Sequence, residues 1–177
     1  MKKWLYSSGY RLGQVRQQLG LVAPLSAGEY GEVSQWLPAE ALALFKAMSS
    51  ADQRHSLRVC RGLQAQGCGD RDMLAASLLH DVGKAEGRVP FWTRPAIVLG
   101  KKLAPGLLKR LVVYPGPQET EFLPGWRRAL SYAWYHAEVG AELAAEAGLS
   151  QQAVRYIRTH HQADGPAAEL HKIDEVS

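Results

Sequence analysis

The sequence contains little cysteine and no long apolar run. Its 177 residues include two cysteines, Cys60 and Cys68, which are too few for a disulfide framework and do not form a CxxC zinc motif. This usage is typical of a reducing compartment, so we expect a cytoplasmic protein. Lys101 and Lys102 interrupt the best apolar stretch, residues 96–108, which is therefore shorter than the roughly 20 residues of a membrane span. The start of the chain also lacks the uninterrupted apolar segment of a signal peptide.

Patterns that identify several other protein classes are missing as well. The sequence has no alternating apolar and polar run long enough for a sheet, no internal repeat and no glycine-rich phosphate loop. Its 21 Lys and Arg against 17 Asp and Glu give a net charge of +4, which suits an anionic partner but does not require one. With 46% hydrophobic residues, the chain is expected to form one packed domain.

Helical periodicity, with capping residues at the right places, is what the sequence does contain. Pro38 is typical of a first helical turn, and Ser50, Asp70 and Ser150 are placed to cap later helices. The fold class is therefore predicted to be all-α, a single-domain bundle of about seven to nine helices. The clearest predicted helices cover residues 38–50, 51–66, 71–82, 125–147, 151–161 and 167–175.

Residues 85–124 differ from the rest because prolines divide them into at most two short helices. We interpret them as an insertion in a domain of residues 37–177, with residues 1–36 as an N-terminal extension that packs on this domain. The insertion could be a helix hairpin packed on the core with its basic residues outward, or a lid that selects the substrate. Peripheral contact with a membrane surface through residues 91–112 is left open. The aromatic and basic residues concerned are Phe91, Trp92, Arg94, Lys101, Lys102, Lys109 and Arg110.

The histidines carry the most functional information. A single histidine in a helix is usually structural, but imidazole and carboxylate groups together are the ligands that Mn, Fe and Zn prefer. Metal sites in helical proteins are built from inward-facing side chains of several helices. Asp81 adds a carboxylate whose two oxygens could bridge two ions about 3.5 to 4 Å apart. The histidines at or near predicted helix ends are His55, His80, His136, His160 and His161.

These residues lie in motifs that resemble a known family. Asp52-Gln53-Arg54-His55, Leu79-His80-Asp81-Val82-Gly83-Lys84 and Ile173-Asp174 are similar to the H...HD...D signature of HD-domain metal-dependent phosphohydrolases. The segments 136–140 and 160–165 resemble the second-metal motifs of the HD-GYP subgroup. The resemblance implies an HD-type bundle with a metal site in its core, between the helices. It implies His55, His80, Asp81 and Asp174 as ligands of one ion, and His136, His160 and His161 as ligands of a second.

The sequence also departs from that subgroup. Asp164-Gly165-Pro166-Ala167 lacks the Gly-Tyr-Pro element, and Ala51 stands where some members carry an acid for a third metal. The resemblance therefore implies two ions and does not extend to cyclic-dinucleotide hydrolysis. Asp164 remains an alternative to Asp174 as a ligand. His171, three residues before Asp174, could support the site or lie on the surface, and we expect it on the surface.

The activity implied by the resemblance is phosphomonoester or phosphodiester hydrolysis by a metal-activated water. The substrate would be a nucleotide or another small phosphorylated molecule. Asp81 would bridge the ions, Lys84 would neutralise a phosphate oxygen, and Arg54 and Arg58 could hold the phosphate through bidentate hydrogen bonds. Lys84 could equally compensate a helix dipole, and the two arginines could form a solvated face. The expected cofactors are two divalent ions, with Fe or Mn favoured over Mg, Ni, Co or Zn.

Two other functions fit the same residues. One is a di-iron oxygenase of the HD type, since some HD-type sites use oxygen chemistry. The other is a non-catalytic signalling module in which the metal is structural. No stable nucleic-acid complex is expected, and the sequence leaves the oligomeric state open.

Overall fold

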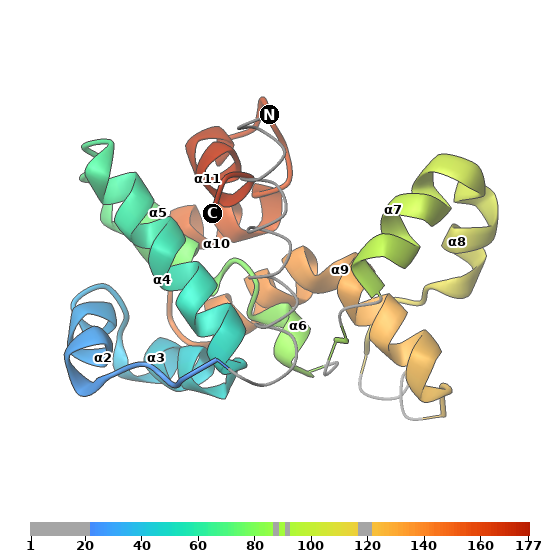
Figure 1. The fold of residues 1–177 in the computed structure, drawn as a ribbon, viewed down its shortest axis with the longest axis horizontal. Coiled ribbons are helices and arrows are strands. Elements are labelled where there is room, and N and C mark those ends of the chain that lie inside the picture. The colour runs from blue at the N-terminus through green and yellow to red at the C-terminus, as the bar shows by residue number, and fades with distance from the viewer. Residues whose placement is uncertain (1–21, 87–88, 91–92, 117–121) are drawn as a thin grey trace, which may run out of the picture.

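The computed structural model describes residues 22–86, 89–90, 93–116 and 122–177, and these contain helices and no strand (Figure 1). The all-α prediction is confirmed. Besides the four-residue α6 (Gly83–Glu86), the described residues form nine helices. These are α2 (Ala27–Ser34), α3 (Ala39–Ala47), α4 (Ser50–Ala65), α5 (Arg71–Leu79), α7 (Thr93–Leu103), α8 (Pro105–Leu111), α9 (Gly125–Glu146), α10 (Gln151–Thr159) and α11 (Ala168–Asp174).

Local sequence explains where most of these helices begin. The Asp70 side chain accepts hydrogen bonds from the first turn of α5, and Ser150 accepts one from Ala153 N at the start of α10. The prediction that Ser50 caps α4 is wrong by one residue. Ser49 has the extended backbone of an N-cap and its Oγ accepts from Asp52 N, while Ser50 is the first residue of the helix. Helix α2, which the periodicity did not predict, begins with a capping box between Ser26 and Glu29.

The main core lies between α3, α4, α5, α10 and α11. Every residue of α5 from Met73 to Leu79 is buried, as its nearly continuous apolar run predicts. Leu78 and Ile157 have no exposed surface, and burial of each such side chain contributes about 1.5–3 kcal/mol. Leu25 and Val33 belong to the same core, so residues 22–36 pack on the domain, whereas residues 1–21 lie outside the described part.

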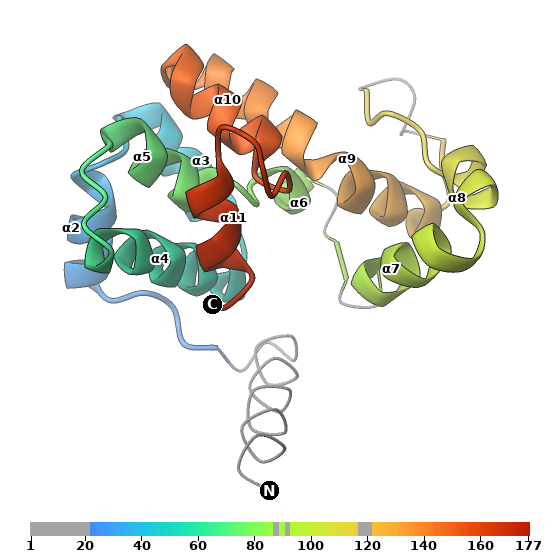
Figure 2. The same cartoon turned by 90° about the horizontal axis from the view of Figure 1, so that it is seen from above.

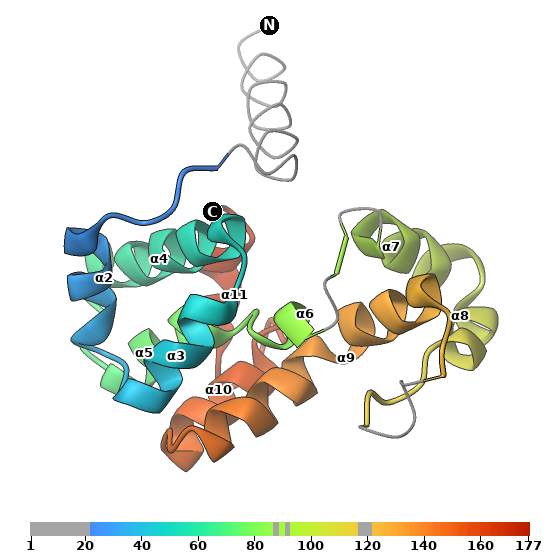
Figure 3. The ribbon, with the colours of Figure 1, turned by 90° about the horizontal axis from the view of Figure 1, so that it is seen from below.

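A second, smaller structural unit lies at the other end of α9. We define the arm as residues 93–116 and 125–135, which comprise α7, α8 and the first half of α9 (Figures 1 and 3). Its own core consists of Leu108, Val112 and Leu130 with partly buried neighbours. The two short helices expected in the insertion are present. Ala96, Ile97 and Leu108 pack in the core of the arm, whereas Val98, Leu99, Leu103 and Leu107 are exposed.

The cysteines and the helices also bear on the sequence-based expectations about disulfides and membrane spans. Cys60 is buried in α4, Cys68 is half-buried, and both are free. Among the described helices, none combines the length and apolar character needed to cross a bilayer.

Candidate metal centre

The predicted ligands come together where five helices meet. Helix α4 carries His55, the end of α5 carries His80 and Asp81, and α9 carries His136. The end of α10 is followed by His160 and His161, and α11 carries Asp174. Figure 2 shows α11 beside α4 and α6 beside α9, an arrangement that also brings together the segments bearing these residues.

The first group consists of His55, His80 and Asp174. One ligand atom from each lies within 4.8 Å of the other two, so the group could hold a metal ion. Asp174 Oδ1 is 2.8 Å from His55 Nε2 and 3.5 Å from His80 Nε2. The structure thus places Asp174 with these histidines, whereas Asp164 is exposed and outside both groups.

The second group consists of His136, His160 and His161. Their ligand atoms also lie within 4.8 Å of one another, and the Nε2 atoms of His136 and His161 are 2.9 Å apart. His136 and His160 are buried, while His161 is exposed. The ring of His160 lies 5.1 Å from that of His80 in the first group, so the two groups are neighbours.

Asp81 lies between the two groups. Its Oδ2 is 3.6 Å from His80 Nε2, and its Oδ1 is 3.5 Å from His136 Nε2. The Lys84 ammonium makes an ion pair with Oδ1 at 2.6 Å. The two oxygens of one carboxylate therefore face one histidine from each group.

Backbone contacts fix the tautomers of three histidines. The Nδ1 atoms of His80, His136 and His160 lie 2.7–2.8 Å from the carbonyl oxygen three residues earlier. A carbonyl oxygen only accepts, so Nδ1 carries the proton and the neutral ring keeps a lone pair on Nε2. Nε2 of His80 and of His160 are buried, with no hydrogen-bond partner in the described part of the chain.

The Nε2 atoms of His80 and His160, which have no partner among the described residues, test whether a metal ion fits the site. Leaving a buried acceptor unsatisfied costs about 1–3 kcal/mol, and native structures usually avoid it. A divalent ion in each group would satisfy His80 and His160 Nε2, and imidazole and carboxylate donors suit Fe, Mn or Zn. The donor set therefore fits metal ions, while it specifies neither their identity nor their number.

The protonation states of the buried groups also suit metal binding. Burial and, to a smaller extent, the nearby Lys84 charge lower the pKa of His136 to about 3. Burial likewise holds the pKa of His160 well below its usual value. Burial would raise the pKa of Asp81, but Lys84 and His80 outweigh it and keep the carboxylate ionised. These three groups are therefore in their ligating forms at neutral pH.

Gly83 sets the distance between residues 80–83 and α9. A Cβ at Gly83 would lie 2.2 Å from the His136 carbonyl oxygen and 2.8 Å from Gly140 N. Only glycine permits this approach, because both obstacles are backbone atoms. The sequence predicts a helix over residues 71–82, but α5 ends at Leu79 and Gly83 begins α6. The sequence signal for this close contact was that both motifs contain a glycine: Gly83 follows His80-Asp81, and Gly140 follows His136.

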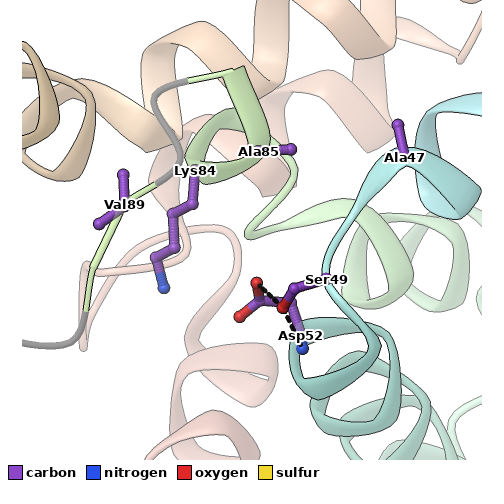
Figure 4. A pocket seen from close by; sticks show the side chains of 6 residues that line it. All are labelled: Ala47, Ser49, Asp52, Lys84, Ala85 and Val89. Atoms are coloured by element: carbon purple, nitrogen blue, oxygen red, sulfur yellow. Dashed lines mark hydrogen bonds between the residues drawn. The ribbon is translucent and has the colours of Figure 1, made fainter. Parts of the chain in front are cut away.

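A cavity of about 360 Å³ opens beside the centre (Figure 4). Ser49, Asp52 and Lys84 contribute its polar lining, with Ala47, Ala85 and Val89 as the apolar part. Lys84 connects the cavity to the ligand groups through its ion pair with Asp81. The sequence analysis did not identify Ser49 and Asp52 as lining residues. The available signal was Asp52, which lies three residues before His55 and therefore near it on the surface of α4.

The other predicted residues are placed differently. Arg54 donates to the carbonyl oxygens of Ala23 and Pro24 and pairs with Glu29, so its donors are directed to the N-terminal segment. Arg58 is exposed on the next turn of α4.

His171 was expected on the surface, but it is half-buried and its Nδ1 lies 3.1 Å from the His160 carbonyl oxygen. This contact links α11 to the end of α10, next to both ligand groups. Spacing alone could not distinguish it from a surface histidine, because the contact crosses between two helices.

Comparisons of the chain with family models, with curated proteins and with solved structures find no match. The geometry of the centre is therefore the basis for an assignment of function.

Proposed function

We propose that this chain is a metal-dependent phosphohydrolase that acts on a nucleotide or a similar small phosphorylated substrate. The HD-type resemblance suggests the reaction, and the single observation that carries the proposal is the position of Asp81. Its two oxygens lie 3.5–3.6 Å from a histidine of each ligand group. A carboxylate between two sets of ligands is the arrangement that a two-metal hydrolytic site requires.

His55, His80 and Asp174 would hold one ion, His136, His160 and His161 the second, and Asp81 would contribute to both. Bound divalent ions supply Lewis-acid activation of water and of a phosphate oxygen. The chain holds these ligands ready for binding. Hydrogen bonds from Nδ1 orient three of the rings, and burial in the core excludes bulk water from His80 and His160. Such orientation from outside the ligand set commonly changes metal affinity about 10- to 100-fold.

Lys84 and the adjacent cavity would accommodate the substrate. The Lys84 side chain is about one-third exposed, lines the cavity and contacts Asp81. A substrate phosphate could therefore meet this ammonium at the edge of the ligand groups, where it would neutralise a phosphate oxygen. Asp52, hydrogen-bonded to Ser49 Oγ at 2.6 Å, gives the far side of the cavity an acceptor. A nucleoside or another group with hydroxyl or amino donors would suit that side, whereas a second phosphate would be repelled.

The proposal is tested by metal content and phosphate release in the same preparations. Wild-type protein purified without chelator should contain close to two divalent ions per chain and release phosphate from at least one nucleotide in a panel. Asp81→Asn, which keeps the shape of the side chain, should lose metal and activity together by about 100-fold or more. Circular dichroism and thermal unfolding show whether the variant is folded. Turnover retained by folded Asp81→Asn would overturn the assignment.

Lys84 and Arg54 form a matched pair for the substrate role. Lys84→Met should keep both ions and lower kcat/KM about 10- to 100-fold, because a charge that meets the phosphate is lost. Arg54→Met removes the same charge at the residue next to the ligand His55 and should leave kcat/KM within about twofold, since the donors of Arg54 contact residues 23–29. Metal-loaded protein that consumes oxygen but releases no phosphate would favour the oxygenase. Metal without either activity would favour a structural role.

A further inference from the structure

Helix α7 leaves large apolar side chains exposed to solvent. Val98, Leu99 and Leu103 are 57–70% exposed. Leu99 and Leu103 follow Ala96 by three and seven residues, so they lie on the same side of the helix as Ala96, which packs within the arm. Helices on a protein surface normally turn polar residues to water and apolar ones inward. The apolar stripe of α7 is therefore wider than the part of it that the arm covers.

The exposed apolar surface continues onto α8 and the start of α9. Leu107 is 59% exposed and Trp126 50% exposed. These two side chains also border an apolar groove of about 250 Å³ between α7, α8 and α9. Phe122, just before α9, is 87% exposed. An apolar groove bordered by exposed large apolar side chains is typical of a surface that binds something other than water.

The charges of the arm have one sign. Residues 93–116 and 125–135 contain Arg94, Lys101, Lys102, Lys109, Arg110, Arg127 and Arg128 and no Asp or Glu. Lys102, Lys109 and Arg110 are exposed on α7 and α8, the helices that also carry exposed apolar residues. The rest of the chain therefore carries all 17 acidic residues. Glu119, Glu121 and Glu138 are the closest in sequence. Glu119 and Glu121 lie outside the described residues, while Glu138, with Glu142, lies on the second half of α9 near Tyr114.

We propose that the arm docks on the surface of an anionic phospholipid bilayer. Exposed Leu and Val would enter the boundary of the acyl chains, Trp126 suits the headgroup level, and Lys102, Lys109 and Arg110 would contact anionic headgroups. A second copy of this arm is disfavoured as the partner because two basic surfaces would repel each other. Nucleic acid is disfavoured because exposed aliphatic side chains neither stack on bases nor pair with phosphates.

The same helix links the arm to the metal centre. Trp126 lies in the first turn of α9, and His136 follows on the same continuous helix. A docked arm would therefore hold the centre at a fixed distance from the bilayer, within about 15 Å along the helix axis. The docking itself requires neither metal nor catalysis, so it can be tested independently of the proposed hydrolase activity.

Vesicle co-sedimentation tests the proposal on the full chain. Wild-type protein should bind vesicles of phosphatidylcholine with about 30 mol% phosphatidylglycerol at least about tenfold more tightly than phosphatidylcholine alone, and about 0.5 M salt should weaken that binding. Leu99→Ser with Leu103→Ser should reduce binding about tenfold or more. Lys109→Glu with Arg110→Glu should do the same. All four side chains are exposed, so thermal unfolding should be unchanged in both double variants.

Matched controls lie outside the arm. Val176→Ser removes an aliphatic side chain that is 75% exposed, and Lys46→Glu with Arg155→Glu reverses two exposed charges on α3 and α10. These variants should bind vesicles like the wild type, and so should Asp81→Asn, which tests the metal centre separately.

Three results would overturn the docking proposal. They are no binding to anionic vesicles, binding that the arm variants leave unchanged, and a dimer that the Leu99→Ser with Leu103→Ser variant abolishes in the absence of lipid binding.

Discussion

The metal centre and the arm depart from the usual distribution of residues in opposite ways. The centre buries His80, Asp81 and His160, polar groups that most proteins leave in water or pair completely. The arm exposes Leu99 and Leu103, apolar groups that most proteins bury. Each arrangement costs free energy in the isolated chain, so each indicates a site completed by something else: metal ions in the core, and an apolar, anionic surface at the arm.

The two regions should differ most in their response to loss of an apolar side chain. Leu78 is fully buried and Leu103 is 70% exposed. Leu78→Ala should lower the free energy of unfolding by about 2–5 kcal/mol, because it removes buried methyl groups and leaves a cavity. Leu103→Ala should change it by less than about 0.5 kcal/mol. Urea unfolding followed by circular dichroism measures both. Equal losses would mean that Leu103 is covered within the chain.

A glycine in each region gives the next comparison. Gly83→Ala should destabilise by about 3 kcal/mol, since its Cβ would overlap the His136 carbonyl oxygen and α6 would have to move from α9. That movement would also separate Asp81 from His136, so the variant should bind less metal. Gly106→Ala on α8 meets no atom within 4 Å and should be neutral or stabilising by up to about 1 kcal/mol.

Urea unfolding and metal analysis of Gly83→Ala and Gly106→Ala test these two expectations. A stable Gly83→Ala variant with its full metal content would show that the close approach of α6 to α9 does not set the geometry of the centre. Destabilisation by Gly106→Ala would show that α8 is more tightly packed than its exposed surface indicates.

Most of the fold was predictable because its signals are local. The caps at Asp70 and Ser150 and the apolar run of α5 predict helices that the structure contains. The end of α5 was not predictable, because the chain leaves the helix at His80 to let Gly83 approach α9, and α9 is more than 40 residues further along the sequence. The exposure of Leu99 and Leu103 was also missed. Periodicity shows which residues are apolar, but tertiary packing decides which face is covered.

The sequence predicted well which residues form the candidate site, but it predicted less well what each of them does. The resemblance implied one set of His55, His80, Asp81 and Asp174 and another of His136, His160 and His161. The structure groups all of these residues except Asp81 in the same two sets, and Asp81 lies between the two. Whether they bind two ions stays a prediction. Arg54 was assigned to substrate because it is adjacent to His55, but neighbours in a helix differ by about 100° in direction. Its hydrogen bonds run to residues 23–29 instead.

The smallest expected effect is a pH dependence that belongs to the centre alone. In metal-free protein, burial first and Lys84 second lower the pKa of His136 to about 3, against about 6.5 in the unfolded chain. Between these values the unfolded state binds the extra proton, so the stability that His136 provides is complete above pH 6.5 and is lost as the pH falls. The expected loss is about 2 kcal/mol between pH 7 and pH 5. His160, with its pKa lowered by burial and by His80, adds to this loss.

The raised pKa of His80, where Asp81 and Asp174 outweigh burial, opposes the loss in part. The lowered pKa values of these two carboxyl groups matter only below about pH 4. The arm contains no histidine, so it contributes nothing in this range. Urea unfolding in a chelating buffer at pH 7, 6 and 5 measures the effect, and His136→Gln, which keeps a donor but cannot titrate, should flatten the profile. An equally steep fall in that variant would place the pH sensitivity at groups other than His136 and remove the argument that the His136 imidazole is held neutral for metal.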